Sequence, residues 1–449
     1  MKPALLTLLL ILFLASCERD FSASPAQSDI SFSADTLSFD TIYAGISTPT
    51  AHFTIHNDGN DDVTISSIQL LQGDDSPFTV NIAGQPASSA SNIRIAHGDS
   101  VFVFASVRNP QPSNGKALTL LQDHIVAQGA NASWTMTLKA VVLNVSRQSG
   151  SISTDTQWLC DTIPYLVQDT LSITDGARLT IGPNVTVLFQ NNATLKVNGS
   201  LIVAGDHVHR SSFMPMRQDG FYQDIPGQWG GIDILPGATA SFSYANIACS
   251  TYGISVDSTA TLFADGLWLR DVSHAAISSR HANLTLRNAL ITNSGSASVS
   301  LTGGTTELTH VTIANYFSWD ARRTEALLIS RADSATTSLR VFNSIIVGSH
   351  NPEVVIDSIA GNVLFSGSLL RTEKKKLESN TKFFQDCLTA SDAHFANRDN
   401  LNYHLAPSSD AIGLGQPHGA SLAPTDFEGF TRFAADTIQA GAFQIVEQQ

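Results

Sequence analysis

The chain has 449 residues and carries 39 acidic side chains against 25 lysines and arginines, which gives a formal net charge of −14 at pH 7. This acidic balance excludes the positively charged surface that nucleic-acid binding requires, so we expect no nucleic-acid partner. Charged residues make up 14% of the sequence, against an average of about 25% for globular domains. Together with abundant Thr and Val, this favours an all-β protein.

The first segment, residues 1–16, is predicted to be a signal peptide. Lys2 precedes the run Ala4–Leu14, which is rich in Leu. This run is shorter than the roughly 20 apolar residues that span a bilayer as a helix, so a secretory signal fits better than a membrane span. The sequence "LASC", which ends at Cys17, resembles the bacterial lipobox, and an ordinary small-residue cleavage site is the alternative. The resemblance implies lipidation of Cys17 and a lipid anchor in a membrane.

Residues 17–28 follow the predicted cleavage site and read as a Ser/Pro/Ala-rich tether. The first four, "CERD", resemble the surface-export signals of Bacteroidetes lipoproteins. Glu18 also differs from the aspartate that retains enterobacterial lipoproteins at the inner membrane. These features imply an outer-membrane lipoprotein on the cell surface, with the membrane as a partner through the anchor.

The region 29–147 consists of short segments of alternating apolar and polar residues that are separated by turn residues such as "NDGNDD". About seven such segments predict an antiparallel Ig-like β-sandwich. The phrases "LSFDTIYAG", "FTIHNDGNDDVTI" and "HGDSVFVFASV" resemble Hydin-type Ig-like domains of bacterial surface proteins. That resemblance implies a spacer or binding module, and we assign this region no chemistry.

A different pattern occupies the region 157–449, where four columns of mostly apolar residues recur at intervals of 22 residues. The columns are Ala240, Leu262, Leu284 and Thr306; Phe242, Ala264, Leu286 and Leu308; Ala245, Leu267, Ala289 and Val311; and Ile247, Leu269, Ile291 and Ile313. A repeat of this length indicates a unit that buries its apolar face only by stacking on its neighbours, as in a solenoid.

We expect each repeat to form one coil of a right-handed parallel β-helix, with two short strands joined by a turn. Two positions after the last column come Cys249, Asp271, Asn293, Asn315 and Gly348, and four of these five, all but the cysteine, are residue types that accept the tight or left-handed backbone of a turn. The upstream stretch "LSITDGARLTIGPNVTVLFQ" and the C-terminal "DFEGFTRFAADTIQAGAFQ" resemble the opening coils and closing segment of the pectate-lyase-like superfamily. That resemblance runs from near Gln157 to near Gln444 and implies the fold.

Members of that superfamily include polysaccharide lyases and hydrolases, so the outward-facing positions were searched for catalytic groups. No outward column stacks two carboxylates, and Asp265 beside Arg287 suits a surface salt bridge. His207, His209 and Arg210 offer two metal ligands at most and fit a solvated turn. We therefore predict no catalytic residue, no metal site and no cofactor.

Two aromatic loops are the candidate ligand-binding segments. The first contains Tyr316, Phe317, Trp319, Arg322 and Arg323, and the second contains Phe221 and Tyr222. Exposed aromatic faces stack on sugar rings, and arginines bind carboxylates bidentately. Burial of the aromatics as packing against the β-helix is the alternative. The sequence thus favours a non-catalytic lipoprotein that binds glycan or matrix through its β-helix; the alternative is a β-helix polysaccharide lyase or glycoside hydrolase.

A tripeptide recurs in which Asp is followed first by Ser or Thr and then by a small aliphatic residue or Thr. This pattern resembles the O-glycosylation sequon of Bacteroidetes. It is also the pattern left when an aspartate closes a turn before a strand. The candidate acceptor residues are Thr36, Thr41, Ser100, Thr162, Thr170, Ser258, Ser334, Ser358 and Thr437.

Overall fold

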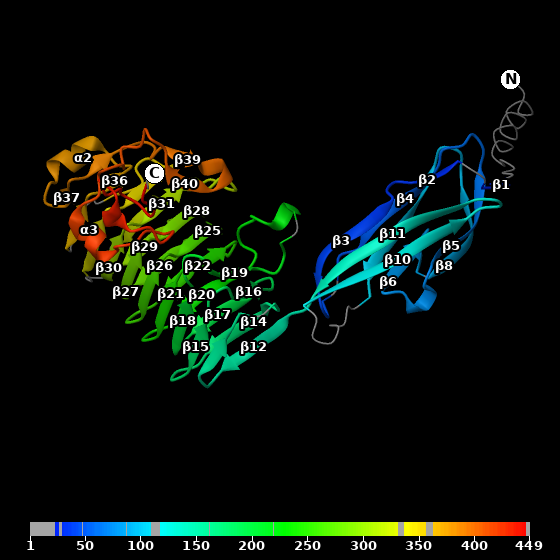
Figure 1. Cartoon of the computed structure of the whole chain (residues 1–449), viewed down its shortest axis with the longest axis horizontal. Helices are drawn as coiled ribbons and strands as arrows, with labels where there is room; N and C mark the ends of the chain where they lie inside the picture. The colour runs from blue at the N-terminus through cyan, green and yellow to red at the C-terminus, as the bar shows by residue number, and fades with distance from the viewer. Residues whose placement is uncertain are drawn as a thin grey trace, which may run out of the picture. The chain divides into compact units, whose positions relative to one another are not determined.

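The computed structural model describes residues 23–26, 29–46, 48–86, 88–108, 117–160, 162–218, 220–330, 336–355 and 362–445, apart from the side chains of Asp40 and Phe221. About 51% of the chain is strand and 6% is helix, which confirms the all-β prediction. The chain divides between Val145 and Ser146 into two compact units (Figure 1). In the described part of the chain, no helix has the length and apolar character needed to cross a membrane.

The N-terminal unit has two sheets that share one hydrophobic core. One sheet has the order β1-β5-β10-β11-β3, with β8 paired to β5, and the other has the order β2-β4-β9-β6-β7. The strands are β1 (Ser24–Pro25), β2 (Ile30–Phe32), β3 (Thr36–Tyr43), β4 (Ala51–Asn57), β5 (Val63–Leu70), β6 (Phe78–Ile82), β7 (Gln85–Pro86), β8 (Ser89–Ile95), β9 (Ser100–Val107), β10 (Leu118–Gln128) and β11 (Ser133–Leu143). A short 3-10 helix, η1 (Gly73–Asp75), follows β5.

Alternation of residues along each strand builds this core. On β4, Phe53 and Ile55 are buried, and on β9, Val103 and Ala105 are buried, while the residues between them face away from the core. Because successive side chains of a strand point to opposite faces, each sheet has one apolar and one outward face.

The C-terminal unit is built from two long sheets whose strands all pair in parallel, consistent with a β-helix (Figure 1). The ten-stranded sheet contains β13 (Thr156–Trp158), β15 (Arg178–Ile181), β18 (Ser200–Ala204), β21 (Thr239–Ser243), β24 (Thr261–Asp265), β27 (Asn283–Arg287), β30 (Gly304–Thr309), β33 (Thr337–Phe342), β35 (Val363–Ser366) and β37 (Phe384–Gln385).

The 17-stranded sheet supplies the remaining strands of the coils. They are β12 (Ser146–Ile152), β14 (Tyr165–Ile173), β16 (Thr186–Phe189), β17 (Thr194–Val197), β19 (Ser211–Pro215), β20 (Gly231–Ile234), β22 (Ala245–Ala248), β23 (Ile254–Val256), β25 (Trp268–Val272), β26 (Ile277–Arg280), β28 (Leu290–Ser294), β29 (Val299–Thr302), β31 (Thr312–Asn315), β32 (Leu327–Ser330), β34 (Ile345–Gly348), β36 (Leu369–Leu370) and β38 (Leu388–Thr389). The first of these, β12, precedes residue 157, where the sequence pattern was expected to begin.

The pairing register reproduces the predicted columns. Ala240 pairs with Leu262, and Leu262 pairs with Leu284, so each column is a ladder of residues from consecutive coils. These residues are buried in one continuous core. The 22-residue period is therefore the length of one coil.

Each complete coil has three strands, which corrects the predicted two. The additional strands β23, β26, β29 and β32 pair with one another in parallel. They are only three or four residues long, and polar residues such as Ser279 are buried among their inward positions. Because these strands are short and their inward positions hold both polar and apolar residues, they leave no clear periodic pattern in the sequence.

The corners of the coils explain why certain polar residues recur. Cys249, Asp271 and Asn293 have φ angles of 61°, 54° and 53°, in the left-handed region that the repeat predicted. The prediction fails for Asn315 and Gly348, which are not among the described residues with positive φ angles and which end β31 and β34. Long insertions follow both strands, so the chain leaves the coil there without a tight corner. A second column of positive φ angles, which the sequence analysis missed, comprises Tyr244, Gly266, Asn288, His310, Asn343 and Gly367.

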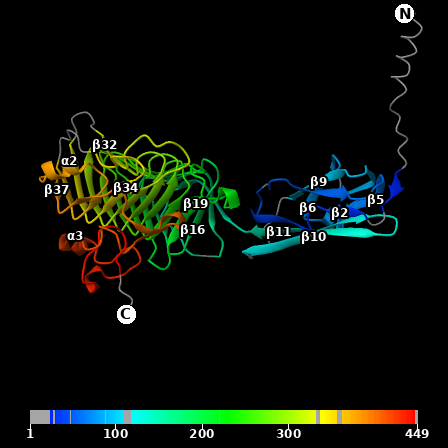
Figure 2. The same ribbon diagram turned by 90° about the horizontal axis from the view of Figure 1, so that it is seen from above.

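The end of the chain folds back along one side of the coils, and we call residues 390–445 the C-terminal strap (Figure 2). The elements of this end region are α2 (Lys374–Ser379), which precedes the strap, and β39 (Phe395–Asn397), η3 (Arg398–Asn400), β40 (Asn402–Leu405), α3 (Pro417–Leu422) and η4 (Arg432–Ala434). Tyr403 and Phe427 of the strap pack on Leu290 and Ile345, which point outward from the coils. The strap thus covers apolar residues that the β-helix core does not bury.

Two arginines fasten the strap to the second corner column. Arg210 donates to the carbonyl oxygens of Gly266 and Phe427, both at 2.6 Å, and its guanidinium carbon lies 3.7 Å from the centre of the Phe427 ring. Arg432 is fully buried and donates to Oδ1 of Asn288 at 2.7 Å. These bonds fix the strap in register with the coils, which places η3 beside the corner that carries Asp271.

Candidate ligand-binding groove

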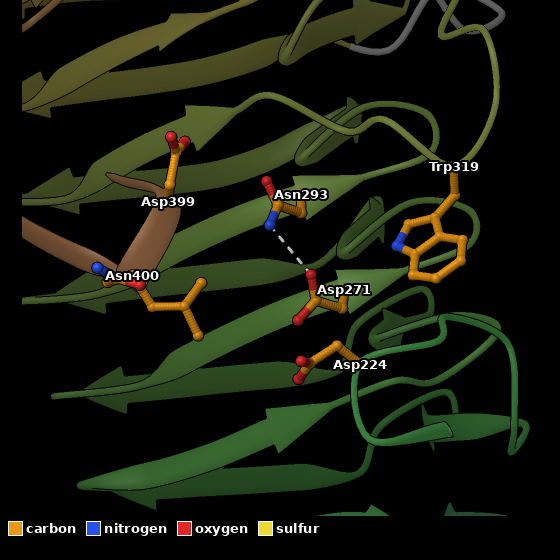
Figure 3. A pocket seen from close by; sticks show the side chains of 7 residues that line it. Asp224, Asp271, Asn293, Trp319, Asp399 and Asn400 are labelled. Carbon is orange, nitrogen blue, oxygen red and sulfur yellow. Dashed lines mark hydrogen bonds between the residues drawn. The ribbon is translucent and has the colours of Figure 1, made fainter. Parts of the chain in front are cut away.

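An open groove with a volume of about 400 Å³ lies where two loops and the C-terminal strap meet over the corners of the coils (Figure 3). Asp271 and Asn293 come from the corners of neighbouring coils, at the ends of β25 and β28. The other lining residues are Asp224 from the β19–β20 loop, Trp319 from the β31–β32 loop, and Asp399, Asn400 and Leu401 from the strap.

The floor of the groove is a bonded set of polar side chains. Asn293 donates from Nδ2 to Oδ1 of Asp271 at 3.0 Å. Nη1 of Arg270 lies 2.8 Å from Oδ1 of Asp224 and also pairs with the carboxylate of Asp271. A single guanidinium therefore holds two carboxylates on the same side of the groove.

Burial shapes the charge of this set. Removal of the Asp271 carboxyl from water raises its pKa, and the cation of Arg270 and the amide of Asn293 offset only part of that rise. Burial lowers the pKa of Arg270, but the neighbouring carboxylates outweigh burial and raise it. Arg270 thus remains a cation that is already neutralised by its two partners.

Trp319 projects over the groove from a loop with a rigid base. Its side chain is 51% exposed, and in Figure 3 its indole lies across from Asp271, with the edge that carries the ring nitrogen toward that side chain. Below it, Nη1 of Arg322 lies 2.8 Å from Oε2 of Glu353. Glu353 also accepts from the backbone N–H groups of Ala326 and His350, at 2.9 and 2.8 Å. An exposed indole on an anchored loop needs little ordering when a ligand stacks on it.

The structure separates the residues of the first predicted aromatic loop. Trp319 lines the groove, and Arg323 is exposed. Phe317 is buried, as in the packing alternative. The Tyr316 hydroxyl lies 3.4 Å from Oδ1 of Asp392, and its ring lies 4.0 Å from the guanidinium carbon of Arg398. Arg322 is occupied by Glu353, so the expected role of this arginine in binding a ligand carboxylate is replaced by an internal ion pair.

The second predicted loop contributes a residue that the sequence did not single out. Tyr222 packs under Arg217, whose guanidinium carbon is 3.3 Å from the ring centre, and the side chain of Phe221 lies outside the described set. Gln228 donates to the carbonyl oxygens of Tyr222 and Ile225, at 2.6 and 3.0 Å, which holds the loop in a compact turn. That turn presents Asp224 to the groove.

The remaining predictions concern metal and surface groups. Oδ2 of Asp206 lies 3.1 Å from Nδ1 of His209, and Arg210 is bound to the strap, so the "DHVHR" segment serves contacts within the fold. Asp265 accepts from Asn288 at 2.8 Å, and its register partner Arg287 lies over the Phe263 ring. Among the described residues, no group of three or more His, Cys, Asp or Glu side chains is arranged to hold a metal ion.

The predicted modification sites are placed unevenly. Cys17, Ser334 and Ser358 lie outside the described residues. The other candidate acceptors are exposed at Thr36, Thr41, Thr162 and Thr437 and half-buried at Ser100, Thr170 and Ser258. Oδ1 of Asp99 and of Asp257 each accept from the following backbone N–H at 2.7 Å, the local turn bond that the structural alternative requires.

Comparison with known proteins adds no identity. No known protein family and no curated protein matches the sequence. Among solved structures, the chain is similar to the YadV chaperone, with 13% identity and a TM-score of 0.18 over 26% of this chain and 52% of that one. It is also similar to a family 123 glycoside hydrolase from Clostridium perfringens, with 9% identity and a TM-score of 0.19 over 27% of this chain and 26% of that one. The chain spans about half of the first structure and about a quarter of the second.

Proposed function

We propose that this chain is an outer-membrane lipoprotein, anchored through Cys17, whose β-helix unit binds a neutral glycan in the groove. In this proposal the N-terminal unit is an Ig-like spacer, and the C-terminal unit is a right-handed, pectate-lyase-like β-helix used for binding. The observation that carries the proposal is the position of Trp319, exposed on an anchored loop and facing hydrogen-bonding side chains across an open groove.

The lining of the groove suits the two faces of a sugar ring. An indole offers a flat apolar surface for the C–H face of a ring, and the carboxylates and amides of Asp224, Asn293 and Asn400 accept from or donate to hydroxyl groups. These groups lie at the rim and floor of the groove, where a ligand replaces water as their partner. Sites of this kind combine an aromatic platform with a few fixed polar groups.

Charge favours a neutral ligand over an acidic one. Three aspartates line the groove, and the adjacent cation Arg270 is already paired with two of them. A uronate or sulfate would meet the carboxylate of Asp399, whose ion pair with Arg398 is long, at 3.8 Å, and exposed. The described residues that line the groove include no lysine or arginine to offset this repulsion. This differs from the sequence-based expectation that arginines hold an acidic ligand, because Arg322 is committed to Glu353.

A glycan array probed with the mature chain tests this function. The account predicts binding to neutral glycans and weaker binding to uronate-rich or sulfated ones. Binding confined to the acidic glycans would contradict the proposed charge preference, and no binding to any glycan would remove the function. Attachment of the anchor is tested separately, since Cys17→Ala should abolish palmitate labelling in a native-like host.

Glycoside hydrolysis is the second candidate, favoured by one observation. Asp271 has a raised pKa next to the carboxylate of Asp224, and hydrolases of this type use one protonated and one ionised carboxyl group. Both carboxylates share Arg270, which places them on one side of the groove instead of across a bond from each other. New reducing ends from a neutral polysaccharide that are lost in both Asp271→Asn and Asp224→Asn would favour hydrolysis over binding.

A further inference from the structure

The outward face of the β2-β4-β9-β6-β7 sheet in the N-terminal unit carries a cluster of exposed rings. Phe102 and Phe104 on β9 are 49% and 41% exposed, and their ring centres are 6.0 Å apart with an angle of 18° between the planes. His52 on the neighbouring strand β4 lies 5.7 and 5.8 Å from these two rings. We call His52, Phe102 and Phe104 the aromatic platform.

The register of the strands fixes this platform on the outer face. His52 pairs directly with Phe104, and the alternating residues Val103 and Ala105 are buried in the core. A shift of β9 by one residue would bury the phenylalanines but would expose the valine and alanine that fill the core. The two rings are therefore held outward by the fold, and with His52 they form one contiguous cluster instead of scattered exposed residues.

Among the described residues, the outward positions of β4, β6 and β9 around the platform are polar and include no Asp, Glu, Lys or Arg. The outward residues of β4, β6 and β9 are His52, Thr54, His56, Thr79, Asn81, Ser100, Phe102, Phe104 and Ser106. Oγ1 of Thr79 lies 2.7 Å from Oγ of Ser106, and Oγ1 of Thr54 lies 2.6 Å from Nε2 of His56. In a chain with a net charge of −14, such a face suits an uncharged partner with hydroxyl groups.

The exposed area of the platform favours a small ligand over a protein partner. A phenylalanine buries about 150–250 Å² when fully covered, so two rings that are nearly half exposed offer on the order of 200 Å². A stable protein–protein interface needs about 800 Å² from each partner. The exposed aromatic area is thus about a quarter of one side of such an interface, and it matches one or two sugar rings.

We propose that the aromatic platform is a second site for a neutral glycan, independent of the groove on the C-terminal unit. Phe102 and Phe104 stack on the apolar faces of the ligand's sugar rings, and the ring nitrogens of His52 bond to hydroxyl groups at their edge. The N-terminal unit is then a binding module as well as a spacer. A polymer that engages both sites would be held more tightly than either site alone allows, because the second contact becomes intramolecular.

The test uses the full mature chain and titrates it with cellohexaose, mannohexaose, maltohexaose and chitohexaose. Trp319→Ala serves as the background, because it removes binding in the groove. Phe102→Ala and Phe104→Ala are then introduced together into this background. The control is Leu71→Ala in the same background, since Leu71 is another exposed apolar residue of the N-terminal unit. Circular dichroism and melting temperature establish that each variant is folded.

The proposal predicts residual binding of at least one of the four hexasaccharides by Trp319→Ala and by its Leu71→Ala control. Removal of both phenylalanines should weaken this binding by about tenfold or more. Equal affinity with and without the phenylalanines, or no residual binding of any of the four sugars, overturns the proposal. A wild-type dimer that the double alanine variant converts to a monomer also overturns it, since a second copy then covers the platform.

The failure of this proposal is distinguishable from failure of the groove. If Trp319→Ala alone leaves affinity unchanged and Phe102→Ala/Phe104→Ala abolishes it, the platform stands and the groove proposal fails. The reverse pattern supports the groove and overturns the platform.

Discussion

Arg322 and Glu353 form a buried ion pair beneath the loop that carries Trp319, with side chains only 2% and 0% exposed. The pair joins the long insertion after β31 to the insertion after β34, so two irregular segments brace each other. Glu353 accepts two further backbone bonds, from Ala326 and His350, which satisfies its carboxylate. The position of Trp319 therefore depends on a charge pair that is not part of the lining of the groove.

Removal of one partner of this pair should be strongly destabilising. Glu353→Ala leaves the Arg322 cation buried without a counter-charge, so we expect the free energy of unfolding to fall by about 3–5 kcal/mol, measured by urea denaturation. The control is Glu307→Ala, which removes the more exposed pair with Arg340 at 3.2 Å and should cost at most about 1 kcal/mol. Similar losses in the two variants would contradict the structural role assigned to Arg322 and Glu353.

His310 predicts a specific loss of stability in mild acid. It is fully buried, with Nδ1 3.2 Å from the carbonyl oxygen of Gly441 in the strap and Nε2 3.0 Å from Nδ2 of Asn343. This arrangement suits a neutral ring that donates from Nδ1 and accepts at Nε2. Burial, reinforced by the cation of Arg432, lowers the pKa of His310 well below 6.5.

Between that lowered pKa and 6.5, the unfolded chain binds a proton that the folded chain does not. The contribution of His310 to stability is therefore present above pH 6.5 and falls by about 1.4 kcal/mol per pH unit as the solution becomes more acidic. His310→Asn should remove this slope. The control is His281→Asn, since His281 is an exposed corner residue with a similar φ of 49° against 53°. An unchanged slope in His310→Asn would show that another group is responsible.

The coil register gives a matched test within one strand. Leu284 and Thr285 are adjacent on β27, and their side chains face the core and the exterior respectively. Leu284→Ala should lower the free energy of unfolding by about 2–5 kcal/mol, because it leaves a cavity in the core. Thr285→Ala should change it by no more than about 0.5 kcal/mol. Equal effects of the two substitutions in thermal or chemical denaturation would contradict the assignment of Leu284 to the core and of Thr285 to the exterior.

Substitutions at two corner glycines distinguish the cost of backbone strain from the cost of steric crowding. Gly237 and Gly266 have φ angles of 79° and 69°. A Cβ at Gly237 would meet nothing within 4 Å, whereas one at Gly266 would lie 2.5 Å from Cδ1 of Tyr244. Gly237→Ala should therefore cost about 1–2 kcal/mol from the left-handed backbone alone. Gly266→Ala should lower the free energy of unfolding by more than this, because the added Cβ also meets the Tyr244 ring. Equal melting temperatures of the two variants would contradict crowding by Tyr244.

The coil could be predicted from the sequence because the requirement for apolar residues in the core is periodic. A residue such as Leu262 lies directly above Ala240 and below Leu284, so the requirement to be apolar repeats once per coil. The third strand of each coil was not accessible, because β26 places both Ile277 and Ser279 at buried positions and leaves a mixed pattern. Periodicity reveals a strand only where every coil fills the same position with the same kind of side chain.

The groove was largely hidden from sequence reasoning for a different reason. Asp271 and Asn293 were recognised only as corner residues, and Asp224 and Asp399 lie in irregular segments far from them in the chain. They meet because Arg210 and Arg432 dock the strap against the coils. Trp319 was identified because it stands in an aromatic insertion, but its exposure depends on the Arg322–Glu353 pair, which is formed across 31 positions of sequence.

The most direct measurement of the central claim is a calorimetric titration of the best neutral glycan from the array into wild-type protein, Trp319→Ala and Phe433→Ala. Trp319 and Phe433 are 51% and 53% exposed, so the two substitutions remove similar exposed aromatic residues from the same unit. The account predicts that Trp319→Ala weakens binding by about tenfold or more, while Phe433→Ala retains the wild-type affinity. Equal affinity of Trp319→Ala and wild-type protein would contradict the assignment of the groove as the glycan site.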